Sequence, residues 1–110
     1  MKHIVEYLQH KNIIFKSFKL IELKELGSRK KISLYLGIDL KNYYAVVMSV
    51  KKKSRVLRKE AGELMALHEK LEKYIDSKIK KKYIIIEAPL CSHAKKMLED
   101  SNWKVWNVTS

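Results

Sequence analysis

The sequence predicts an α/β fold, a mixed β-sheet with helices on both of its faces. Two apolar segments, Tyr43 to Val50 and Tyr83 to Ile86, have the composition of central strands that are covered on both sides. Between them, apolar residues recur every three or four positions from about Val56 to Asp76, which is the pattern of a long amphipathic helix. A helix that joins two buried strands, preceded by a meander of strands, predicts a mixed sheet.

The composition is that of a small, basic, globular protein. A chain of 110 residues has room for one core, so we expect a single domain spanning residues 1–110. The 24 Lys and Arg outweigh the 12 Asp and Glu, for a net charge of +12, which predicts binding to a polyanion, most often nucleic acid. A lysine-rich thermophilic proteome is the alternative explanation, but such proteomes usually raise glutamate alongside lysine.

The sequence also indicates where the protein acts. The lone Cys91 excludes an intramolecular disulfide, and the four histidines are scattered without the spacing of a zinc site. The first twelve residues carry charges throughout, and no apolar run approaches the ~18 residues of a membrane span. We therefore expect a soluble, cytoplasmic protein that does not enter a membrane.

The first elements are a short helix and two strands. Ile4, Val5 and Leu8 form one apolar stripe on a helix ending near Asn12, and from Ile13 the period changes to that of a strand reaching toward Leu23. The loop of residues 27–31 carries three consecutive cations and is either a phosphate-binding loop or a solvated turn. A strand follows over 32–40, with a close approach or a bulge at its glycine.

A cluster of cations follows the buried strand that ends at Val50. It leads into the long helix, whose opening turn carries Arg55, Arg58 and Lys59, and cations there are unfavourable unless an anion lies nearby. Further along the helix, His68 is expected to be a helix-face residue rather than a ligand.

The last third of the chain alternates strand and helix. A basic turn from Lys78 to Lys82 precedes the second buried strand, which Pro89 ends. Ser92 is expected to cap a helix over 93–100. The final strand spans 103–106, and its two tryptophans are expected to close the core rather than to stack on bases.

Several short groups of residues recur in the order of a known family: Gly27-Ser28, Lys31, Leu40-Lys41-Asn42, Lys51 and Arg58-Lys59-Glu60, with Ile4-Val5, Leu8 and Lys11 before them. This series, which needs no gap from Gly27 to Ser54, resembles the archaeal Holliday junction resolvases, dimeric relatives of restriction endonucleases. The resemblance implies a restriction-endonuclease-like core, a homodimer and branched DNA as the partner.

The departures from that family concern its catalytic carboxylates. The family's Pro-Asp falls on Tyr35-Leu36, and the Glu of its Glu-X-Lys falls on Ser49. The Glu of its first helix falls at about Met1, and its Gln after Arg-Arg-Glu falls on Ala61. Because charged oxygens hold the Mg²⁺ that activates water, we expect no catalytic residues, no metal and no cofactor.

Our leading interpretation is a non-catalytic DNA-binding protein in recombination or repair. Its binding should follow DNA shape, since no element is suited to reading base edges. The expected nucleic-acid-binding residues share a hydroxyl or a positive charge beside the buried strand: Ser28, Arg29, Lys30, Lys31, Lys51, Lys52, Lys53, Arg55, Arg58 and Lys59.

Two alternatives remain. In the first, the protein is an active, Mg²⁺-dependent, structure-selective endonuclease with relocated catalytic residues Asp39, Lys51 and Glu87 or Glu60, in which a bulge at Gly37 turns Asp39 toward Lys51. Otherwise Asp39 is a turn residue. In the second, the chain is a protein-interaction subunit of a recombination or repair complex and its charge serves solubility.

Overall fold

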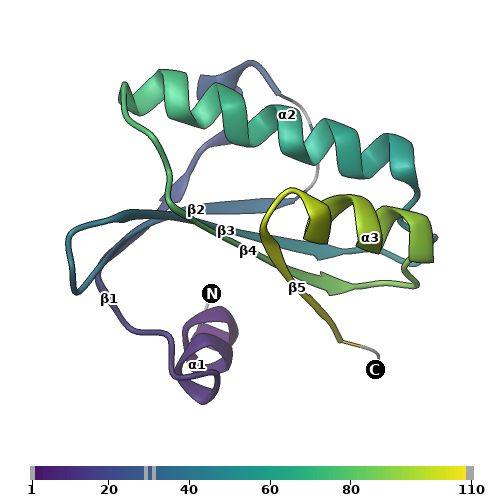
Figure 1. Cartoon of the computed structure of the whole chain (residues 1–110), viewed down its shortest axis with the longest axis horizontal. Coiled ribbons are helices and arrows are strands. Elements are labelled where there is room, and N and C mark those ends of the chain that lie inside the picture. Colours follow the sequence, from purple (N-terminus) through teal and green to yellow (C-terminus); the bar gives the residue numbers. More distant parts are fainter. Residues whose placement is uncertain (1, 29, 31, 109–110) are drawn as a thin grey trace.

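The computed structural model describes residues 2–28, 30 and 32–108, and Figure 1 shows the arrangement of its helices and strands. In chain order the elements are α1 (Lys2–His10), β1 (Phe15–Ile21), the short 3₁₀ helix η1 (Leu23–Leu26), β2 (Ser33–Asp39), β3 (Tyr44–Lys51), α2 (Arg58–Ile75), β4 (Lys81–Glu87), α3 (Ser92–Asp100) and β5 (Trp103–Asn107). None of the described helices is long and apolar enough to cross a membrane.

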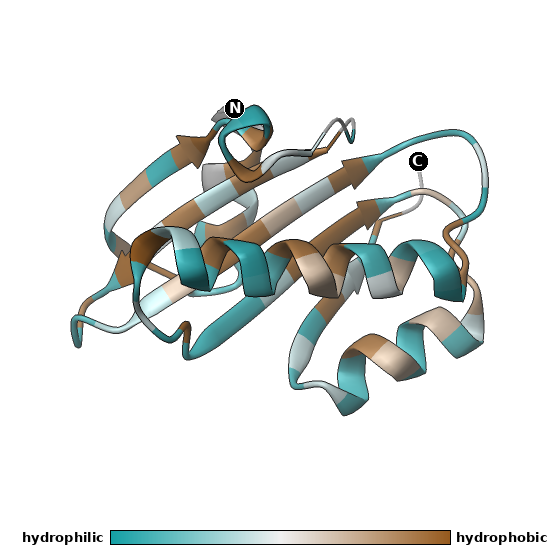
Figure 2. Ribbon diagram, turned by 90° about the horizontal axis from the view of Figure 1, so that it is seen from above, coloured by the Kyte–Doolittle hydropathy of each residue, from teal (hydrophilic) through white to brown (hydrophobic). Residues whose placement is uncertain are grey.

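The strands form one mixed sheet in the order β1-β2-β3-β4-β5. β1, β2 and β3 are antiparallel neighbours, whereas β4 runs parallel to β3 and β5 runs parallel to β4. The two parallel connections are made by α2 and α3, which lie side by side on one face of the sheet (Figures 1 and 2). The helix α1 covers the other face, so the predicted mixed sheet with helices on both faces is confirmed.

The alternation of side chains along β3 explains the two halves of the core. Val46, Met48 and Val50 point into the cluster beneath α2 and α3. Ala45 and Val47 point the other way, into the cluster beneath α1. Because both faces are covered, the strand is apolar at nearly every position, as the sequence indicates.

Element boundaries differ from expectation at three places. Ser92 does not cap α3: Cys91 holds the extended cap position and Ser92 is the first helical residue. Leu23 begins η1 instead of extending β1. Val56 forms an isolated bridge with Leu90 before α2 begins, so it lies outside the helix. By contrast, Asn12 does adopt the left-handed conformation expected after the first helix, with φ of 61°.

Gly37 makes room for an aromatic ring without a bulge in its own strand. A Cβ at this position would lie 2.8 Å from Cδ1 of Phe15, so the ring packs where other residues carry a side chain. The pairing of β2 with β3 is regular through Gly37, and the irregularity of the sheet lies in β1, between Phe15 and Ser17. Of the two alternatives expected at Gly37, the close approach is therefore confirmed, here by the Phe15 ring, and the bulge is absent from β2 as described.

The tryptophan at the start of β5 closes the larger half of the core. Trp103 is buried and its ring meets His68 of α2 edge to face, with the centroids 5.8 Å apart. Nε2 of His68 lies 3.5 Å from Oε2 of Glu72, one turn along the same helix. Trp103 and His68 thus help to pack α2 against the sheet, as the sequence predicts.

Candidate nucleic-acid interface

One edge of the sheet gathers the predicted DNA-binding segments. β3 and β4 are parallel, so their carboxyl ends meet there, with Lys51 opposite Glu87. β2 is antiparallel to β3 and starts at the same edge, since Ser33 pairs with Ser49. The loop before β2, the turn after β3 and the start of α2 therefore lie together at what we call the carboxyl edge, the place where open α/β sheets bind ligands.

The carboxyl edge carries most of the cations that the sequence singles out. The described ones share this location and are mostly exposed: Lys30, Lys51, Lys52, Lys53, Arg55, Arg58 and Lys59. Ser28 is half-buried, and its Oγ accepts a hydrogen bond of 3.3 Å from the backbone N–H of Lys30. Arg29 and Lys31, predicted to join this surface, lie outside the described residues.

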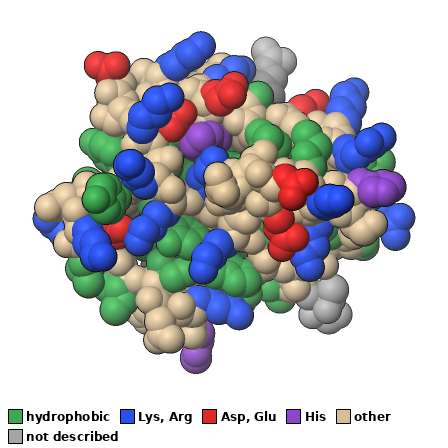
Figure 3. Space-filling view, in the orientation of Figure 1, with side chains coloured by type: hydrophobic (Ala, Val, Ile, Leu, Met, Phe, Trp, Pro, Cys, Tyr) green, Lys and Arg blue, Asp and Glu red, His purple; other side chains and the backbone are tan. Residues whose placement is uncertain are grey.

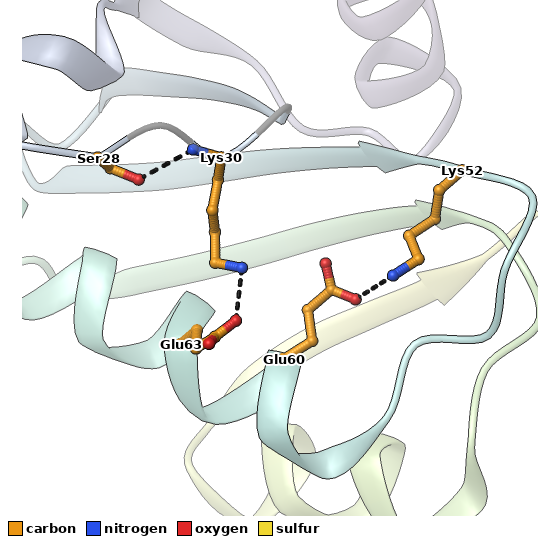
Figure 4. Close-up of polar contacts among 5 residues, drawn as sticks. All are labelled: Ser28, Lys30, Lys52, Glu60 and Glu63. Atoms are coloured by element: carbon orange, nitrogen blue, oxygen red, sulfur yellow. Dashed lines mark hydrogen bonds and ion pairs between the residues drawn. The ribbon is translucent and has the colours of Figure 1, made fainter.

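Two acids of α2 hold two of the lysines (Figure 4). Nζ of Lys30 lies 2.6 Å from Oε1 of Glu63, and Lys52 forms an ion pair with Glu60. Lys30 holds the pKa of Glu63 below its usual value, with help from Lys59 and Lys52. The loop before β2 and the turn after β3 are thereby tied to the same helix.

The other cations of the edge remain available to a ligand. Across the described part of the chain, no ion pair engages Lys51, Lys53, Arg55, Arg58 or Lys59. Lys51, Lys52 and Lys53 border a hollow of about 910 Å³ that Glu87, Ala88, Pro89 and Val108 complete. A second hollow of about 360 Å³ lies toward α2, between Lys30, Lys52 and Glu60. Such unpaired cations beside open hollows can contact phosphate oxygens.

Asp39 lies at the opposite edge of the sheet from Lys51. Its backbone N–H donates to the carbonyl of Tyr43, which precedes β3, whereas Lys51 ends β3. The seven residue steps of that strand separate them by roughly 20 Å. The expectation that a bulge at Gly37 brings Asp39 toward Lys51 is wrong, because β2 stays in regular register through the glycine.

Asp39 is instead the organising residue of the turn between β2 and β3. Its Oδ1 accepts hydrogen bonds of 2.9 Å from the backbone N–H groups of Lys41 and Tyr43, and Nζ of Lys81 lies 3.0 Å from its Oδ2. The N–H of Tyr43 lowers the pKa of Asp39, against the effect of burial and with help from Lys81. The turn-residue interpretation of Asp39 is confirmed.

The two remaining candidate carboxylates point to different sides of the sheet. Glu60 belongs to α2 and is held by Lys52, whereas Glu87 continues the face of β4 on which Tyr83 and Ile85 pack beneath α1. Glu87 and Lys51 are therefore neighbours on one face, and Glu60 lies on the other. Among the described residues, no three His, Cys, Asp or Glu side chains converge in a way that could hold a metal ion.

Leu36 and Ser49 are the two positions on which the resemblance places the catalytic carboxylates of the resolvases. Leu36 is buried in the cluster beneath α2 and α3, and Ser49 is half-buried on the face of β3 that also bears Lys51. Sequence reasoning missed Glu63, which anchors Lys30. The spacing of three residues puts Glu60 and Glu63 on one side of the helix, so the sequence could have indicated an acidic side of α2, although not its contact with Lys30.

Comparisons with known proteins bear on the fold. No protein-family model matches the chain, and no curated protein matches it by sequence. Among solved structures, the apo form of EndoMS superposes with a TM-score of 0.58 at 18% identity, over 99% of this chain and 46% of that one. A repair endonuclease from Pyrococcus abyssi gives 0.56 at 15% identity, over 97% and 45%.

A complex of EndoMS with double-stranded DNA gives a TM-score of 0.56 at 16% identity, over 98% of this chain and 44% of that one. The chain thus spans less than half the length of the structures it resembles. At these identities the likeness shows the fold alone: the chain has the α/β, restriction-endonuclease-like fold of these structures.

Proposed function

We propose that this chain is a non-catalytic DNA-binding protein that acts in DNA recombination or repair. The observation that carries the proposal is the gathering of seven described cations at the carboxyl edge of a nuclease-like sheet. Glu60 and Glu63 offset two of them, and the rest are free of ion pairs within the described chain. A surface of this kind binds the phosphate backbone by charge and shape.

The choice of DNA as the partner rests on the fold. The structural neighbours include a repair endonuclease from Pyrococcus abyssi and EndoMS, which was also solved in complex with double-stranded DNA. The resolvase-like order of residues from Gly27 to Ser54 supports branched DNA, bound by a homodimer that presents two carboxyl edges. Three lysines, Lys51, Lys52 and Lys53, border the hollow of about 910 Å³, so a phosphate backbone bound there would meet several positive charges.

The proposal that the protein does not cut DNA rests on the side chains beside Lys51. Ser49 stands where the resolvases carry a glutamate, and Leu36 where they carry an aspartate. A metal-dependent nuclease needs at least two converging carboxylates to hold Mg²⁺ and activate water. Of the candidate carboxylates Asp39, Glu60 and Glu87, only Glu87 lies beside Lys51 on the same face of the sheet, and one carboxylate is too few to hold the metal.

The test is a titration of the purified protein onto a labelled four-way junction, a matched duplex and a single strand, with Mg²⁺ or Mn²⁺ present. Native gels report binding and denaturing gels report cleavage of the same samples. We expect the junction to be bound more tightly than the duplex and all strands to remain intact.

A second candidate function has one supporting observation, the adjacency of Lys51 and Glu87 at the edge of a hollow. If the protein is an endonuclease built on this pair, denaturing gels will show metal-dependent nicks that vanish in Glu87→Gln. Absence of binding to all three DNA substrates would overturn both functions and leave a protein-interaction subunit of a repair complex.

A further inference from the structure

A second basic surface lies at the opposite, amino edge of the sheet. It is built from the turn between β2 and β3, the loop that leads into β4 and the start of β1. Two hydrogen bonds join these segments: the N–H of Lys80 donates to the carbonyl of Tyr44 at 3.1 Å, and Lys16 donates to Oδ1 of Asn42. The three segments thus form one continuous surface, which we call the amino edge.

The amino edge is strongly positive. Residues 39–44 and 78–82 carry one aspartate against five lysines, namely Lys41, Lys78, Lys80, Lys81 and Lys82, and Lys16 adds to them. The aspartate, Asp39, is buried and neutralised by Lys81. Glu72 of α2 is also engaged, since it accepts a hydrogen bond from the N–H of Ile79. The exposed Asp76, which follows α2, is one further acid beside the five lysines, so the surface stays strongly positive. Figure 3 shows lysine and arginine side chains gathered over the end of the molecule where this turn lies.

Exposed apolar groups stand among these lysines. The side chain of Tyr43 is 46% exposed and that of Leu40 is 65% exposed, at a turn where polar residues are usual. Nζ of Lys80 lies 5.9 Å from the centre of the Tyr43 ring, so cation and ring share one spot on the surface. An accessible aromatic ring flanked by cations is how proteins bind unpaired nucleotides, since every base has a face that can stack.

The turn that presents this ring is held in place before any ligand arrives. Asp39 accepts from the N–H groups of both Lys41 and Tyr43, and its own N–H donates to the carbonyl of Tyr43. The backbone on either side of the ring is therefore fixed, which lowers the entropy cost of binding.

We infer that the amino edge is a site for single-stranded DNA, in which a base stacks on Tyr43 and the flanking phosphates contact Lys41, Lys80 and Lys16. Within a duplex the bases stack on one another and leave a free face only at the two ends, so the ring gives this surface a preference for unpaired strands. The inference goes beyond the proposed function, because it concerns the opposite edge of the sheet and stands or falls independently of the carboxyl edge.

The experiment uses fluorescence anisotropy with two labelled probes, a ten-nucleotide oligothymidylate and a blunt duplex, at low salt. Tyr43→Ala is compared with Tyr43→Phe, which keeps the ring. Both changes are at an exposed position, and circular dichroism will confirm that each variant is folded. We expect Tyr43→Ala to weaken oligothymidylate binding roughly tenfold, Tyr43→Phe to bind as the unmodified protein does, and duplex binding to be unchanged in both.

Two further measurements make the site specific. Lys41→Gln with Lys80→Gln should weaken oligothymidylate binding, whereas Lys51→Gln with Lys53→Gln should weaken duplex binding and spare the oligonucleotide. Ultraviolet crosslinking to bromodeoxyuridine should place the adduct on the peptide that contains Tyr43. The inference is overturned if the oligonucleotide is not bound, if Tyr43→Ala binds it as well as Tyr43→Phe does, or if the adduct maps to the carboxyl edge.

Discussion

Lys52 and Glu60 form an ion pair between the turn after β3 and the first turn of α2. Glu60 is the one acid in a first turn that also contains Arg58 and Lys59, and its side chain is 18% exposed. The negative charge of Glu60 therefore stabilises the positive end of the helix dipole and offsets the charges of Arg58 and Lys59. If the carboxyl edge binds DNA as proposed, this ion pair competes with a phosphate for Lys52, so a stable helix start would come at the expense of DNA affinity.

We predict that Glu60→Gln strengthens DNA binding and slightly weakens folding. Loss of the negative charge frees Lys52, so affinity for duplex DNA should rise roughly threefold at low salt. The free energy of unfolding should fall by about 1 kcal/mol or less, since the pair is partly solvated. DNA titration and urea unfolding measure the two effects. Glu99→Gln, an exposed acid near the end of α3, is the control that should leave affinity unchanged.

Replacing Lys51 and Lys53 by Gln should flatten the salt dependence of duplex binding. Removal of one lysine–phosphate interaction reduces the slope of log K against log salt by about 0.9, so removal of two reduces it by about 1.8. Lys70→Gln with Lys73→Gln removes the same charge from the far half of α2 and should leave the slope near its original value. Equal slopes in the two variants would show that net charge, rather than the carboxyl edge, drives binding.

The pair of Asp39 and Lys81 should make stability depend on pH at both extremes. The pKa of Asp39 is lowered, chiefly by the N–H of Tyr43. The carboxylate therefore adds to the free energy of unfolding at any pH above the usual pKa range of aspartate, and this stabilisation is lost as the pH falls through the lowered pKa. The pKa of Lys81 is raised, chiefly by Asp39. The ammonium group therefore adds to the free energy of unfolding at any pH below the ordinary lysine pKa of 10.5, and this stabilisation is lost as the pH rises through the raised pKa.

Asp39→Asn should therefore lower the urea midpoint of unfolding at neutral pH, and the midpoint of this variant should fall less steeply as the pH is lowered. Because Asp39 lies a strand length from Lys51, duplex binding at the carboxyl edge should not change. Chemical denaturation between pH 2 and 7, together with one DNA titration, tests both statements. Loss of duplex binding in a variant that remains folded would contradict the placement of Asp39 outside that site.

Gly37→Ala should be destabilising although alanine suits the backbone there. The new Cβ would lie 2.8 Å from Cδ1 of Phe15, so the ring must move at a cost of about 1–3 kcal/mol. Phe15→Leu removes the obstructing ring, and the two changes together should cost less than the sum of each alone. A double-mutant cycle by urea unfolding gives the coupling, and strict additivity would show that the ring does not fill the space above the glycine.

The sequence was most informative where burial decided the structure. Tyr43 to Val50 reads as a central strand because both of its faces are covered, and that coverage leaves few polar positions. The clustering of Lys51, Lys52 and Lys53 with Arg58 was predictable for a related reason, since the end of a parallel strand and the start of the next helix are close in the chain.

Sequence reasoning failed where an interaction joins distant segments or a turn reverses the chain. Asp39 is twelve positions from Lys51, but the reversal at Asn42 sends the two residues to opposite ends of the sheet. Glu63 meets Lys30 across 33 positions, a pairing that no local pattern encodes. The start of the last helix was also placed one residue late: the backbone of Cys91 is extended and Ser92 is already helical, so Cys91 takes the cap position expected of Ser92.

The order of the strands in space repeats their order in the chain, from β1 to β5. Each strand can therefore pair with a neighbour that precedes it in the chain, so no strand has to wait for a later segment before it docks. If the sheet forms in this order, β5 joins last, and the fluorescence of Trp103 and Trp106 should report the completion of folding after β1, β2 and β3 have paired. A tryptophan signal that changes as early as the far-ultraviolet circular dichroism in stopped-flow refolding would rule out this sequence of events.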